Sequence, residues 1–571
     1  MKHRIGPGRP LLALAVMLAM LGVVSWRLFD IAWRRHTWYA QTAQAQANGV
    51  SNVLVRGNIS LTDAGGGQHV VATNRTFPML MVNASKFDAS TTDATAATIA
   101  GILGLEAKDV AALLRSVTSG SKAISRKLTD AQATALKAAN IRGVSIGYET
   151  DRSYPAGSLA ADVVGFLGYG RDGRQGQYGI ESSYEKELSG RARSGGGGWH
   201  AFAQLGRLIG RTEEKEQEQD DRPVDVELTL DANIQAYAQT VLDGVLKKYD
   251  AASGVLLVQE PMTGRILAMA DSPSFDPNRY GSFPVGTFLN GALLPFEPGS
   301  SVKPFTMAMG IDLGKITPST VFDDQGPMLI DGYTIKNFNE QSFGRVTMTK
   351  VLEKSINTGV MWVETQIGND AFLNYAVNMG FGQRTGIDLP GEASGDISNL
   401  YSGRRINYLT ASFGQGITVT PLQLIGGYSA IANGGKLLRP YVVAATVDEL
   451  GKRTETKPEI IGTPFTAKTA AQLRAMLTSV VDNGFDKARI PRYDVAGKTG
   501  TAQIASPTGG YLEKQYNHSF VGFAPASDPK FVILIKMEKP QGITFAADSL
   551  SPAFKDMALF LLNYFNVPPT R

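Results

Sequence analysis

Four short apolar runs constrain the fold of this 571-residue chain more than any other feature. Residues 254–258 and 265–270 flank a turn, whereas residues 520–524 and 530–537 lie close to the C-terminus. The length of the runs and their β-branched residues predict strands, and the long stretch between the two pairs carries helical patterns. Strands at both ends of a helical stretch predict one α+β domain, in which an antiparallel sheet unites two hairpins that are distant in sequence.

Two helices are expected to flank this sheet. Residues 228–246 predict a strand followed by an amphipathic helix, with Asp231 as the N-cap. Residues 553–565 carry apolar side chains at helical spacing and close the domain.

The region before Val224 predicts a second α+β domain with shorter elements. Residues 53–55 and 79–82 have the pattern of strands, and residues 111–114 and 130–139 have that of helices.

A glycine-rich stretch and a charged run mark the end of this second domain. The glycines at 194–198 are not followed by Gly-Lys-Ser/Thr, so they indicate a linker or hairpin rather than a nucleotide-binding loop. The run EEKEQEQDDR at 213–222 predicts solvated surface. We therefore expect a domain boundary before Val224.

The N-terminus carries an uncharged apolar segment of 17 residues, 10–26, preceded by three basic residues. This length is at the lower limit for a membrane-spanning helix, and continuation to Trp33 completes the span if Arg27 reaches the interface. The alternative is a cleaved signal peptide, but its small-residue site, Ala43-Gln44-Ala45, lies far beyond the segment. We expect a short cytoplasmic tail at 1–9, a transmembrane anchor at 10–33 and a helical stalk after it.

Composition excludes several classes of site. The chain has no cysteine, so it forms neither disulfides nor thiolate metal sites. Its five histidines are scattered without metal-ligand spacing, and a net charge of +4 is small for this length. We therefore expect no metal site of these kinds and no nucleic-acid partner.

Three short motifs follow one another in the C-terminal domain. They are Ser300-x-x-Lys303, Ser355-x-Asn357 and Lys498-Thr499-Gly500-Thr501. Each is weak alone: a Ser-x-x-Lys is usually a solvated helix face, and it also occurs at Ser119 and Ser183, where we interpret it as chance. The ordered set is typical of serine acyl transferases that use lysine in place of histidine.

The residues of the first two motifs each have a chemical role. Ser300 is the expected nucleophile, and Lys303 can act as its base if burial and a second cation, Lys498, remove its proton. Ser355 can relay a proton between Lys303 and a leaving amine, and Asn357 suits a substrate amide.

The third motif is expected to bind substrate. Lys498 and the hydroxyls of Thr499 and Thr501 suit a carboxylate, and Gly500 lets a substrate peptide lie along the strand. The backbone N–H groups of Ser300 and Thr501 are the expected oxyanion-binding pair.

With these motifs and their flanks, the chain resembles the class B penicillin-binding proteins, the monofunctional peptidoglycan D,D-transpeptidases, and most closely their cell-division (septal) type. The resemblance covers residues from about 20 to 571. Its segments include EPGSSVKPF (297–305), LEKSINTGV (352–360), TGIDLPGE (385–392), SFGQGITVTPLQL (412–424), AIANGGKLLRPYVV (430–443), VAGKTGTAQ (495–503), SFVGFAPASDPKFVILI (519–535) and, upstream, Arg56-Gly57-Asn58-Ile59, RSYPAGSLAADVVGFLG (152–168) and YGIESSYEKELSG (178–190).

The resemblance implies a fold and a reaction. A penicillin-binding, β-lactamase-like transpeptidase domain at 224–571 would follow an elongated α+β pedestal (dimerisation-type) domain with its stalk at 34–223. Ser300 would attack the penultimate D-alanine of a stem peptide, release the terminal D-alanine and pass the acyl group to a neighbouring amine. β-Lactams would acylate the same serine. The absence of any metal or organic cofactor is likewise only what the resemblance implies.

The resemblance also implies a setting. The enzyme would be a single-pass protein of the inner or plasma membrane with its catalytic domain on the extracytoplasmic side. A membrane glycosyltransferase and other division proteins would be its partners. The alternatives are a D,D-carboxypeptidase or β-lactamase-type hydrolase on the same fold and a non-catalytic divisome scaffold.

The sequence departs from the family pattern at one place. After Arg56-Gly57-x-Ile59 it continues as Ser-Leu-Thr-Asp-Ala-Gly-Gly-Gly over 60–67, where the family has an Asp-Arg-Asn-Gly-like turn. This departure puts the local contact of the pedestal in doubt, and not the catalysis.

Overall fold

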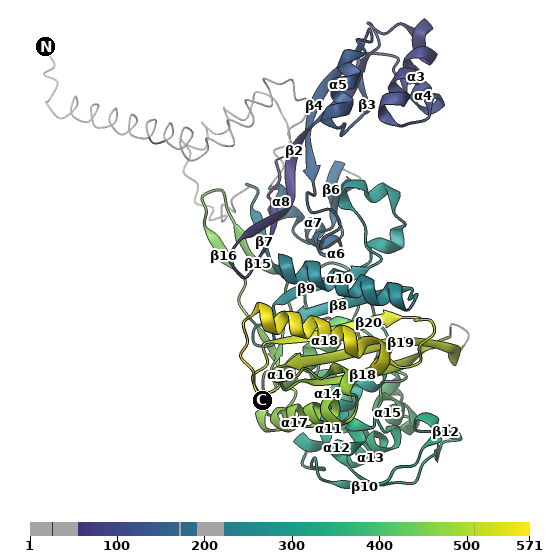
Figure 1. Cartoon of the computed structure of the whole chain (residues 1–571), viewed down its shortest axis with the longest axis vertical. Helices are drawn as coiled ribbons and strands as arrows, with labels where there is room; N and C mark the ends of the chain where they lie inside the picture. Colours follow the sequence, from purple (N-terminus) through teal and green to yellow (C-terminus); the bar gives the residue numbers. More distant parts are fainter. Residues whose placement is uncertain (1–25, 27–54, 171–172, 191–221, 507–508) are drawn as a thin grey trace, which may run out of the picture. The chain divides into compact units, whose positions relative to one another are not determined.

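The computed structural model describes residue 26 and residues 55–170, 173–190, 222–506 and 509–571 (Figure 1). The predicted stalk and glycine-rich stretch lie outside these ranges, as do the predicted anchor apart from Trp26 and the charged run apart from Arg222. Within the described ranges, no helix combines the length and the apolar character that crossing a bilayer requires.

The chain divides into two compact units. Of the described residues, the smaller unit contains Val55, Arg56 and Thr73–Ser153. The larger unit consists of Gly57–Ala72 and Tyr154–Arg571. Residues 154–190, which we expected in the N-terminal domain, therefore cluster with the larger unit.

The smaller unit is a three-stranded antiparallel sheet with three helices. Within it, β2 (Gln68–Asn83) pairs with β4 (Val144–Ser153) and with β3 (Ser121–Ser125). The helices are α3 (Thr92–Leu103), α4 (Ala107–Arg115) and α5 (Asp130–Ala138). Their apolar faces share a core with the sheet, which includes Leu80, Val82, Ile99, Val110, Leu114 and Leu136.

Most local predictions for this unit are confirmed. Residues 79–82 lie in β2, 111–114 lie in α4, and 130–138 form α5, which begins with a capping box between Thr129 and Gln132. Val55, by contrast, lies outside any strand, and its predicted strand partners 53–54 are not described.

The larger unit is organised around a five-stranded antiparallel sheet in the order β18-β19-β20-β8-β9. Its strands are β8 (Ser253–Gln259), β9 (Ile266–Ser272), β18 (Ala496–Ala505), β19 (Tyr511–Ala524) and β20 (Phe531–Glu538). The four predicted strands are thus confirmed, and β20 pairs with β8 to join the two hairpins. β18 lies at one edge of the sheet.

Two helices cover one face of this sheet, α10 (Ala232–Lys248) and α18 (Ala546–Tyr564) (Figure 1). The predicted cap is confirmed, because the Asp231 carboxylate accepts the backbone N–H groups of Asn233 and Ile234 at 2.9 and 3.0 Å. The core between helices and sheet includes Leu242, Leu256, Phe520, Ile533 and Phe554.

Helix α18 begins seven residues earlier than predicted, at Ala546, and continues through Pro552. A proline has no N–H for the carbonyl four residues before it. Here the Tyr249 hydroxyl lies 3.5 Å from that carbonyl, of Asp548, and donates to it. The Tyr249 hydroxyl therefore supplies the hydrogen bond that Pro552 cannot donate. The sequence alone leads us to expect Pro552 before the helix rather than within it.

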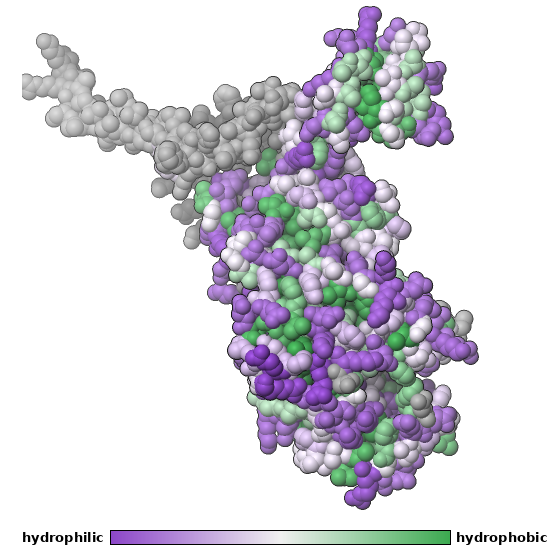
Figure 2. Space-filling model, viewed as in Figure 1, coloured by the Kyte–Doolittle hydropathy of each residue, from purple (hydrophilic) through white to green (hydrophobic). Residues whose placement is uncertain are grey.

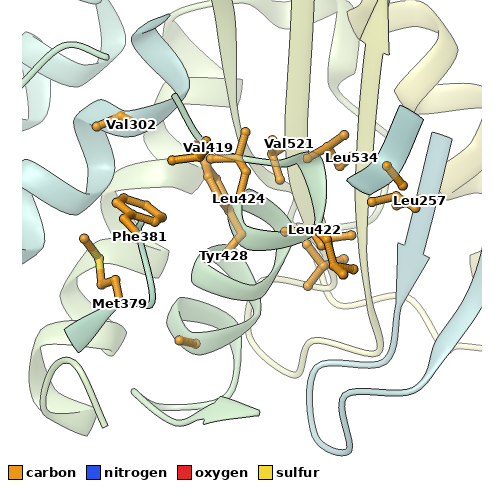
Figure 3. Packing of buried hydrophobic residues seen from close by; sticks show 14 of the residues in the cluster. Leu257, Val302, Met379, Phe381, Val419, Leu422, Leu424, Tyr428, Val521 and Leu534 are labelled. Carbon is orange, nitrogen blue, oxygen red and sulfur yellow. The ribbon is translucent and has the colours of Figure 1, made fainter. Parts of the chain in front are cut away.

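The opposite face of the sheet packs on the buried helix α16 (Pro421–Ala432). Figure 3 shows Leu422, Leu424 and Tyr428 of this helix among Leu257, Val521 and Leu534 of the strands. Every residue of α16 is buried, so this helix lies in the interior of the unit. The Tyr428 hydroxyl donates to the Ser301 carbonyl at 2.8 Å and so ties this helix to the residue after the expected nucleophile.

A second sheet of the larger unit carries the departure from the family pattern. Strand β1 (Ile59–Thr62) runs parallel to β7 (Asp225–Asp231), which also pairs with β15 (Val443–Val447) and through it with β16 (Arg453–Glu455). After β1 the chain turns through 63–67, where the Asp63 carboxylate accepts the N–H groups of Gly65 and Gly67.

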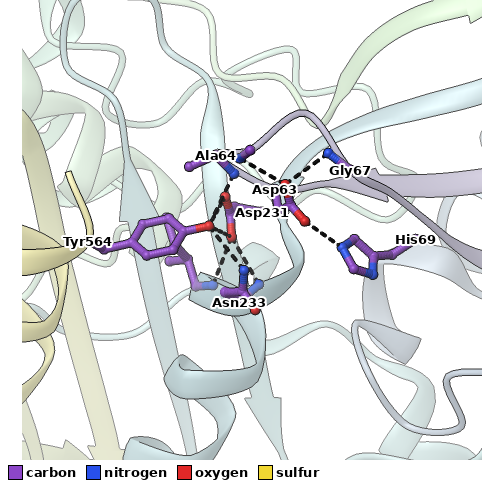
Figure 4. A network of polar contacts seen from close by, with 9 residues as sticks. Asp63, Ala64, Gly67, His69, Asp231, Asn233 and Tyr564 are labelled. Atoms are coloured by element: carbon purple, nitrogen blue, oxygen red, sulfur yellow. Dashed lines mark hydrogen bonds and ion pairs between the residues drawn. The ribbon is translucent and has the colours of Figure 1, made fainter.

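This turn contacts the C-terminal helix (Figure 4). The backbone N–H of Ala64 donates to the Tyr564 hydroxyl at 3.1 Å, and that hydroxyl donates to the Asp231 carboxylate. The divergent segment therefore contacts the C-terminal helix within the larger unit.

The remaining elements of the larger unit are helices and short strands that lie before the first hairpin or between the two hairpins. Their bounds are β5 (Phe166–Gly170), β6 (Gly173–Gln177), α6 (Ala161–Val164), α7 (Gly179–Ser183), α8 (Glu185–Ser189), η3 (Pro277–Ser282), η4 (Val285–Phe288), η5 (Gly291–Leu293), η6 (Gly299–Val302), α11 (Lys303–Asp312), β10 (Val321–Asp324), β11 (Met328–Ile330), β12 (Tyr333–Ile335), η7 (Phe338–Glu340), β13 (Gly344–Thr347), α12 (Met348–Glu353), α13 (Asn357–Ile367), α14 (Asn369–Asn378), η8 (Ser398–Ser402), α15 (Arg405–Ala411), β14 (Leu437–Leu438), β17 (Ile460–Gly462), α17 (Ala467–Asn483) and η9 (Asp486–Ala488). On the visible face, hydrophobic side chains are scattered among hydrophilic ones (Figure 2).

Candidate active site

The expected nucleophile, Ser300, lies in the tight 3-10 turn η6 that leads into α11. Its neighbours Gly299, Ser301 and Val302 are buried, whereas Ser300 is half-buried and lines a cavity. Gly299 has φ +55°, and a Cβ there would come within 3.0 Å of Ala502 on β18. Glycine is therefore required both by the backbone conformation and by the close approach of the strand.

Lys303 is the first residue of α11 and is completely buried. The helix thus starts three residues later than a helical Ser-x-x-Lys would place it, and Ser300 lies in the turn η6 that directly precedes Lys303. The Lys303 Nζ donates to the Ser355 carbonyl at 2.5 Å, to the Ser355 Oγ at 3.1 Å and to the Asn357 Oδ1 at 2.7 Å.

Lys498 on β18 is the second buried lysine of the site, with 1% of its surface exposed. Its Nζ donates to the Ser355 Oγ at 3.1 Å and to the Thr499 carbonyl at 3.1 Å. The Ser355 hydroxyl is therefore shared by the two ammonium groups, in the position that a proton relay requires.

Neither lysine has a carboxylate partner within ion-pair distance in the part of the chain that the structure describes. Burial lowers the pKa of Lys303 well below that of an ordinary lysine, and the charge of Lys498 lowers it further. Burial lowers the pKa of Lys498 to about 7. A lysine in this setting gives up its proton near neutral pH and can serve as a base.

Ser355 adopts an unusual backbone conformation, with φ +54°. A residue with a Cβ in this left-handed region costs about 1–3 kcal/mol, and such residues concentrate at functional sites. Here the conformation lets both the carbonyl and the hydroxyl of Ser355 face Lys303.

Asn357 is the first residue of α13, and both ends of its side-chain amide already have protein partners. The Oδ1 accepts from Lys303, and the Nδ2 donates to the Lys336 carbonyl at 2.9 Å. One N–H and one lone pair remain for a ligand, because an amide offers two of each.

A cavity of ≈ 430 Å³ opens in front of these groups. Its lining includes Ser300 and four other residues that we predicted to be catalytic or substrate-binding, which are Ser355, Asn357, Thr499 and Thr501. The two lysines lie behind this lining and reach it through Ser355.

Gly500 faces the nucleophile turn. A Cβ at this position would come within 2.6 Å of the Pro298 carbonyl and 2.3 Å of the Ser519 Oγ. Its missing side chain therefore lets β18 approach η6, which is a different reason from the one that we predicted. Because β18 is an edge strand, its outer backbone groups remain available for an extended peptide.

Several lining residues carry no signal in the sequence. They come from the loop before α12 and from the segment before α18, and they include Lys336, Asn337, Phe338, Thr544 and Phe545. The rings of Phe338 and Phe545 meet edge to face with centroids 4.7 Å apart. Neither residue belongs to a motif, and only the fold brings them together.

A buried polar network holds Asn337 in place. Its Nδ2 donates to the Asp324 carboxylate at 2.9 Å, and its Oδ1 accepts the backbone N–H of Thr358 at 3.1 Å. Thr358 also donates to Asp324 at 2.7 Å. This network fixes the Lys336 carbonyl, the acceptor of Asn357, against the start of α13.

The other two Ser-x-x-Lys matches form no such site. Lys122 lies in strand β3, three residues after Ser119, and Ser183 ends α7 while Lys186 belongs to α8. Lys122 and Lys186 are both exposed, whereas Lys303 is completely buried.

Two family models match this chain. The penicillin-binding protein transpeptidase domain matches residues 254–558, and the penicillin-binding protein dimerisation domain matches residues 55–224.

Named relatives and solved structures agree with these models. Stage V sporulation protein D of Bacillus subtilis is 32% identical over 78% of this chain and 69% of its own length. The probable peptidoglycan D,D-transpeptidase PbpC of Pseudomonas aeruginosa is 35% identical over 78% of this chain and 76% of its own. The crystal structure of penicillin-binding protein 3 from Mycobacterium tuberculosis in complex with aztreonam is 28% identical, covers 90% of this chain and 97% of the other, and superposes with a TM-score of 0.66.

One assignment follows from three findings. They are a catalytic-domain model that matches more than half of the chain, relatives above 30% identity and a shared architecture. The chain belongs to the penicillin-binding protein transpeptidase family.

Proposed function

We propose that this protein is a peptidoglycan D,D-transpeptidase that cross-links stem peptides through an acyl-enzyme at Ser300. The observation that carries the proposal is the pair of buried lysines that share the Ser355 hydroxyl behind Ser300. Relatives named as peptidoglycan D,D-transpeptidases and related structures in complex with aztreonam and ampicillin support it.

In the first half-reaction, neutral Lys303 takes the proton of the Ser300 hydroxyl. The Ser300 oxygen bonds to the carbonyl carbon of the penultimate D-alanine, and the backbone N–H groups of Ser300 and Thr501 stabilise the oxyanion. The bond to the terminal D-alanine then breaks. Its nitrogen receives the proton from Lys303 through the Ser355 hydroxyl, which contacts both lysines.

In the second half-reaction, the amine of another stem peptide attacks the acyl carbon. A C–N bond forms, the bond to the Ser300 oxygen breaks, and the proton lost by the amine returns to Ser300 through the same groups. No metal or cofactor enters either step.

The donor peptide would lie along β18. We assign its terminal carboxylate to Lys498 and to the hydroxyls of Thr499 and Thr501, and one of its amides to Asn357. Both threonines line the cavity, and Asn357 keeps one free N–H and one free lone pair there.

The cellular setting remains part of the proposal. Residues 10–33 would anchor the chain in the membrane, 34–223 would form the pedestal, and 224–571 would form the extracytoplasmic catalytic domain. Since relatives include a homologue of FtsI and two PbpB proteins, we propose a septal role beside a membrane glycosyltransferase and other division proteins.

The direct test is labelling of the detergent-solubilised full-length chain with a fluorescent penicillin. Wild type should form a covalent adduct, whereas Ser300→Ala should form none because the attacking oxygen is absent. Ser301→Ala is the matched control, because Ser301 is buried and donates to the Pro298 carbonyl at 2.7 Å. Equal labelling of wild type and Ser300→Ala would refute the nucleophile.

Product analysis then identifies the acceptor. Incubation of the same protein with lipid-linked or polymeric peptidoglycan should give cross-linked dimers by mass spectrometry. Release of D-alanine without any dimer would instead indicate a D,D-carboxypeptidase on the same fold.

A further inference from the structure

A fully buried histidine, His518, lies behind one wall of the substrate cavity. It is on β19, directly opposite Thr501 of β18. Directly opposed residues of an antiparallel pair project their side chains to the same face of the sheet. His518 and Thr501 therefore both face the start of α18.

Two hydrogen bonds define the state of the imidazole. The Nε2 lies 3.1 Å from the Thr544 carbonyl, and the Nδ1 lies 2.8 Å from the Ser549 Oγ. A carbonyl can only accept, so Nε2 carries the hydrogen, and Nδ1 of the neutral ring accepts from the Ser549 hydroxyl. Burial favours this neutral ring, because it lowers the pKa of His518 to about 4.

These two bonds hold the chain on both sides of Phe545. Thr544 precedes that residue, and Ser549 lies in the first turns of α18, which begins at Ala546. Thr544, Phe545 and Ala547 all line the cavity. The imidazole therefore acts as a clasp on the segment that forms this wall.

The same segment determines how Thr501 can bond. The backbone N–H of Ala546 donates to the Thr501 Oγ1 at 3.2 Å. Among the described residues, no acceptor receives a hydrogen bond from the Thr501 hydroxyl. With its oxygen engaged as an acceptor, the hydroxyl directs its hydrogen away from Ala546, and a ligand carboxylate in the cavity can accept it.

We infer that His518 is a positioning residue for substrate recognition: it clasps the 544–549 segment so that the Thr501 hydroxyl is presented as a donor to the carboxylate of the bound peptide or β-lactam. This inference rests on the proposed function. If the clasp is lost, Ala546 no longer orients Thr501, and carboxylate binding weakens. Ser300, Lys303 and Ser355 lie on other elements and keep their geometry.

The chain offers variants that separate the two bonds. His518→Gln keeps a donor for the Thr544 carbonyl, His518→Asn keeps an acceptor for Ser549, and His518→Leu keeps neither. Ser549→Ala removes one bond without changing the histidine. Ser551→Ala is its matched control, because Ser551 is buried on the same helix and its Oγ has no hydrogen-bond partner in the described structure.

The experiment measures acylation of the full-length protein by a fluorescent penicillin as a function of penicillin concentration. This yields a half-saturating concentration and a rate at saturation, and each variant's thermal unfolding is recorded as a check of the fold. Loss of a buried hydrogen-bond partner should raise the half-saturating concentration of Ser549→Ala and His518→Leu about tenfold. The rate at saturation should stay within about twofold of wild type, as expected when a binding contact is lost.

His518→Gln and His518→Asn should each recover part of the affinity, and Ser551→Ala should match wild type. The inference is wrong if Ser549→Ala keeps the wild-type half-saturating concentration, or if Ser551→Ala loses as much as Ser549→Ala. It is also wrong if the rate at saturation falls while the half-saturating concentration does not change. Absence of labelling in wild type would instead refute the proposed function, so the two failures are distinguishable.

Discussion

Among the described residues of the larger unit, two pairs of like-charged side chains are wholly or partly buried, and one of these pairs faces a nucleophile. Lys303 and Lys498 lie behind Ser300 and share the Ser355 hydroxyl. Asp162 and Asp271 lie near the start of α6 and in β9, where Asp162 accepts from Ser274 at 2.8 Å. In both pairs, burial and a neighbouring like charge favour the neutral form.

The directions of the shifts follow from the sign of the charge. Burial raises the pKa of Asp162 well above the ordinary value, and the charge of Asp271 raises it further. Burial raises the pKa of Asp271 to about 6. A neutral carboxyl with no reactive neighbour only affects stability, whereas a neutral lysine beside a serine and a relay hydroxyl is a base. Burial therefore creates a catalytic base only where the fold also places a nucleophile and a relay hydroxyl beside the neutral group.

Replacement of Lys303 by methionine should give the largest effect. Lys303→Met keeps most of the side-chain volume but removes the base, so acylation by penicillin should fall about 10³-fold. The unfolding temperature should stay close to that of wild type, because the removal of a desolvated amine without a counter-charge offsets the loss of its hydrogen bonds to Ser355 and Asn357.

Two measurements check this prediction, stopped-flow acylation and thermal unfolding of the same preparation. A variant that acylates at the wild-type rate would exclude lysine from the base role. A large loss of stability would show that Lys303 supports the fold and would make the loss of rate uninformative.

The sequence predicted the sheet and the motifs but not how the motifs meet. Apolar runs located β8, β9, β19 and β20, and Asp231 located the start of α10, because these signals are local. The contact of Asn357 with Lys303, and of Phe338 with Phe545, depends on side chains from distant elements. The start of α18 was predicted too late, and the Tyr249 hydroxyl that compensates for Pro552 within this helix is more than 300 residues away in sequence.

The aspartate pair should give a smaller effect, on stability alone. Both carboxyls have raised pKa values, so this pair binds more protons in the folded protein than in the unfolded chain above about pH 4. The contribution of the pair to the free energy of unfolding should therefore fall as pH rises from about 4 through 6 and beyond. Asp162→Asn removes one charge and should raise the free energy of unfolding at about pH 7.5 by about 1–3 kcal/mol.

Denaturant unfolding at about pH 4.5 and 7.5 tests this expectation. The gain of Asp162→Asn should shrink at the lower pH, where the aspartates are largely protonated in the folded state. Asp528→Asn is a suitable control, because the Asp528 side chain is exposed and its ion pair with Lys530 lies on the surface. A gain that does not depend on pH would contradict the proposed charge repulsion, and penicillin acylation should be unchanged in both variants.

The pH dependence of acylation at saturating penicillin tests most directly whether Lys303 is a neutral base. The rate should be measured on the full-length protein from about pH 5 to 10, with Ser300→Ala as the background. Because burial and Lys498 lower the pKa of Lys303, the rate should reach its plateau well below the pH of about 10 at which an ordinary lysine loses its proton. A rate that keeps rising until about pH 10, where an ordinary lysine loses its proton, would contradict the role of Lys303.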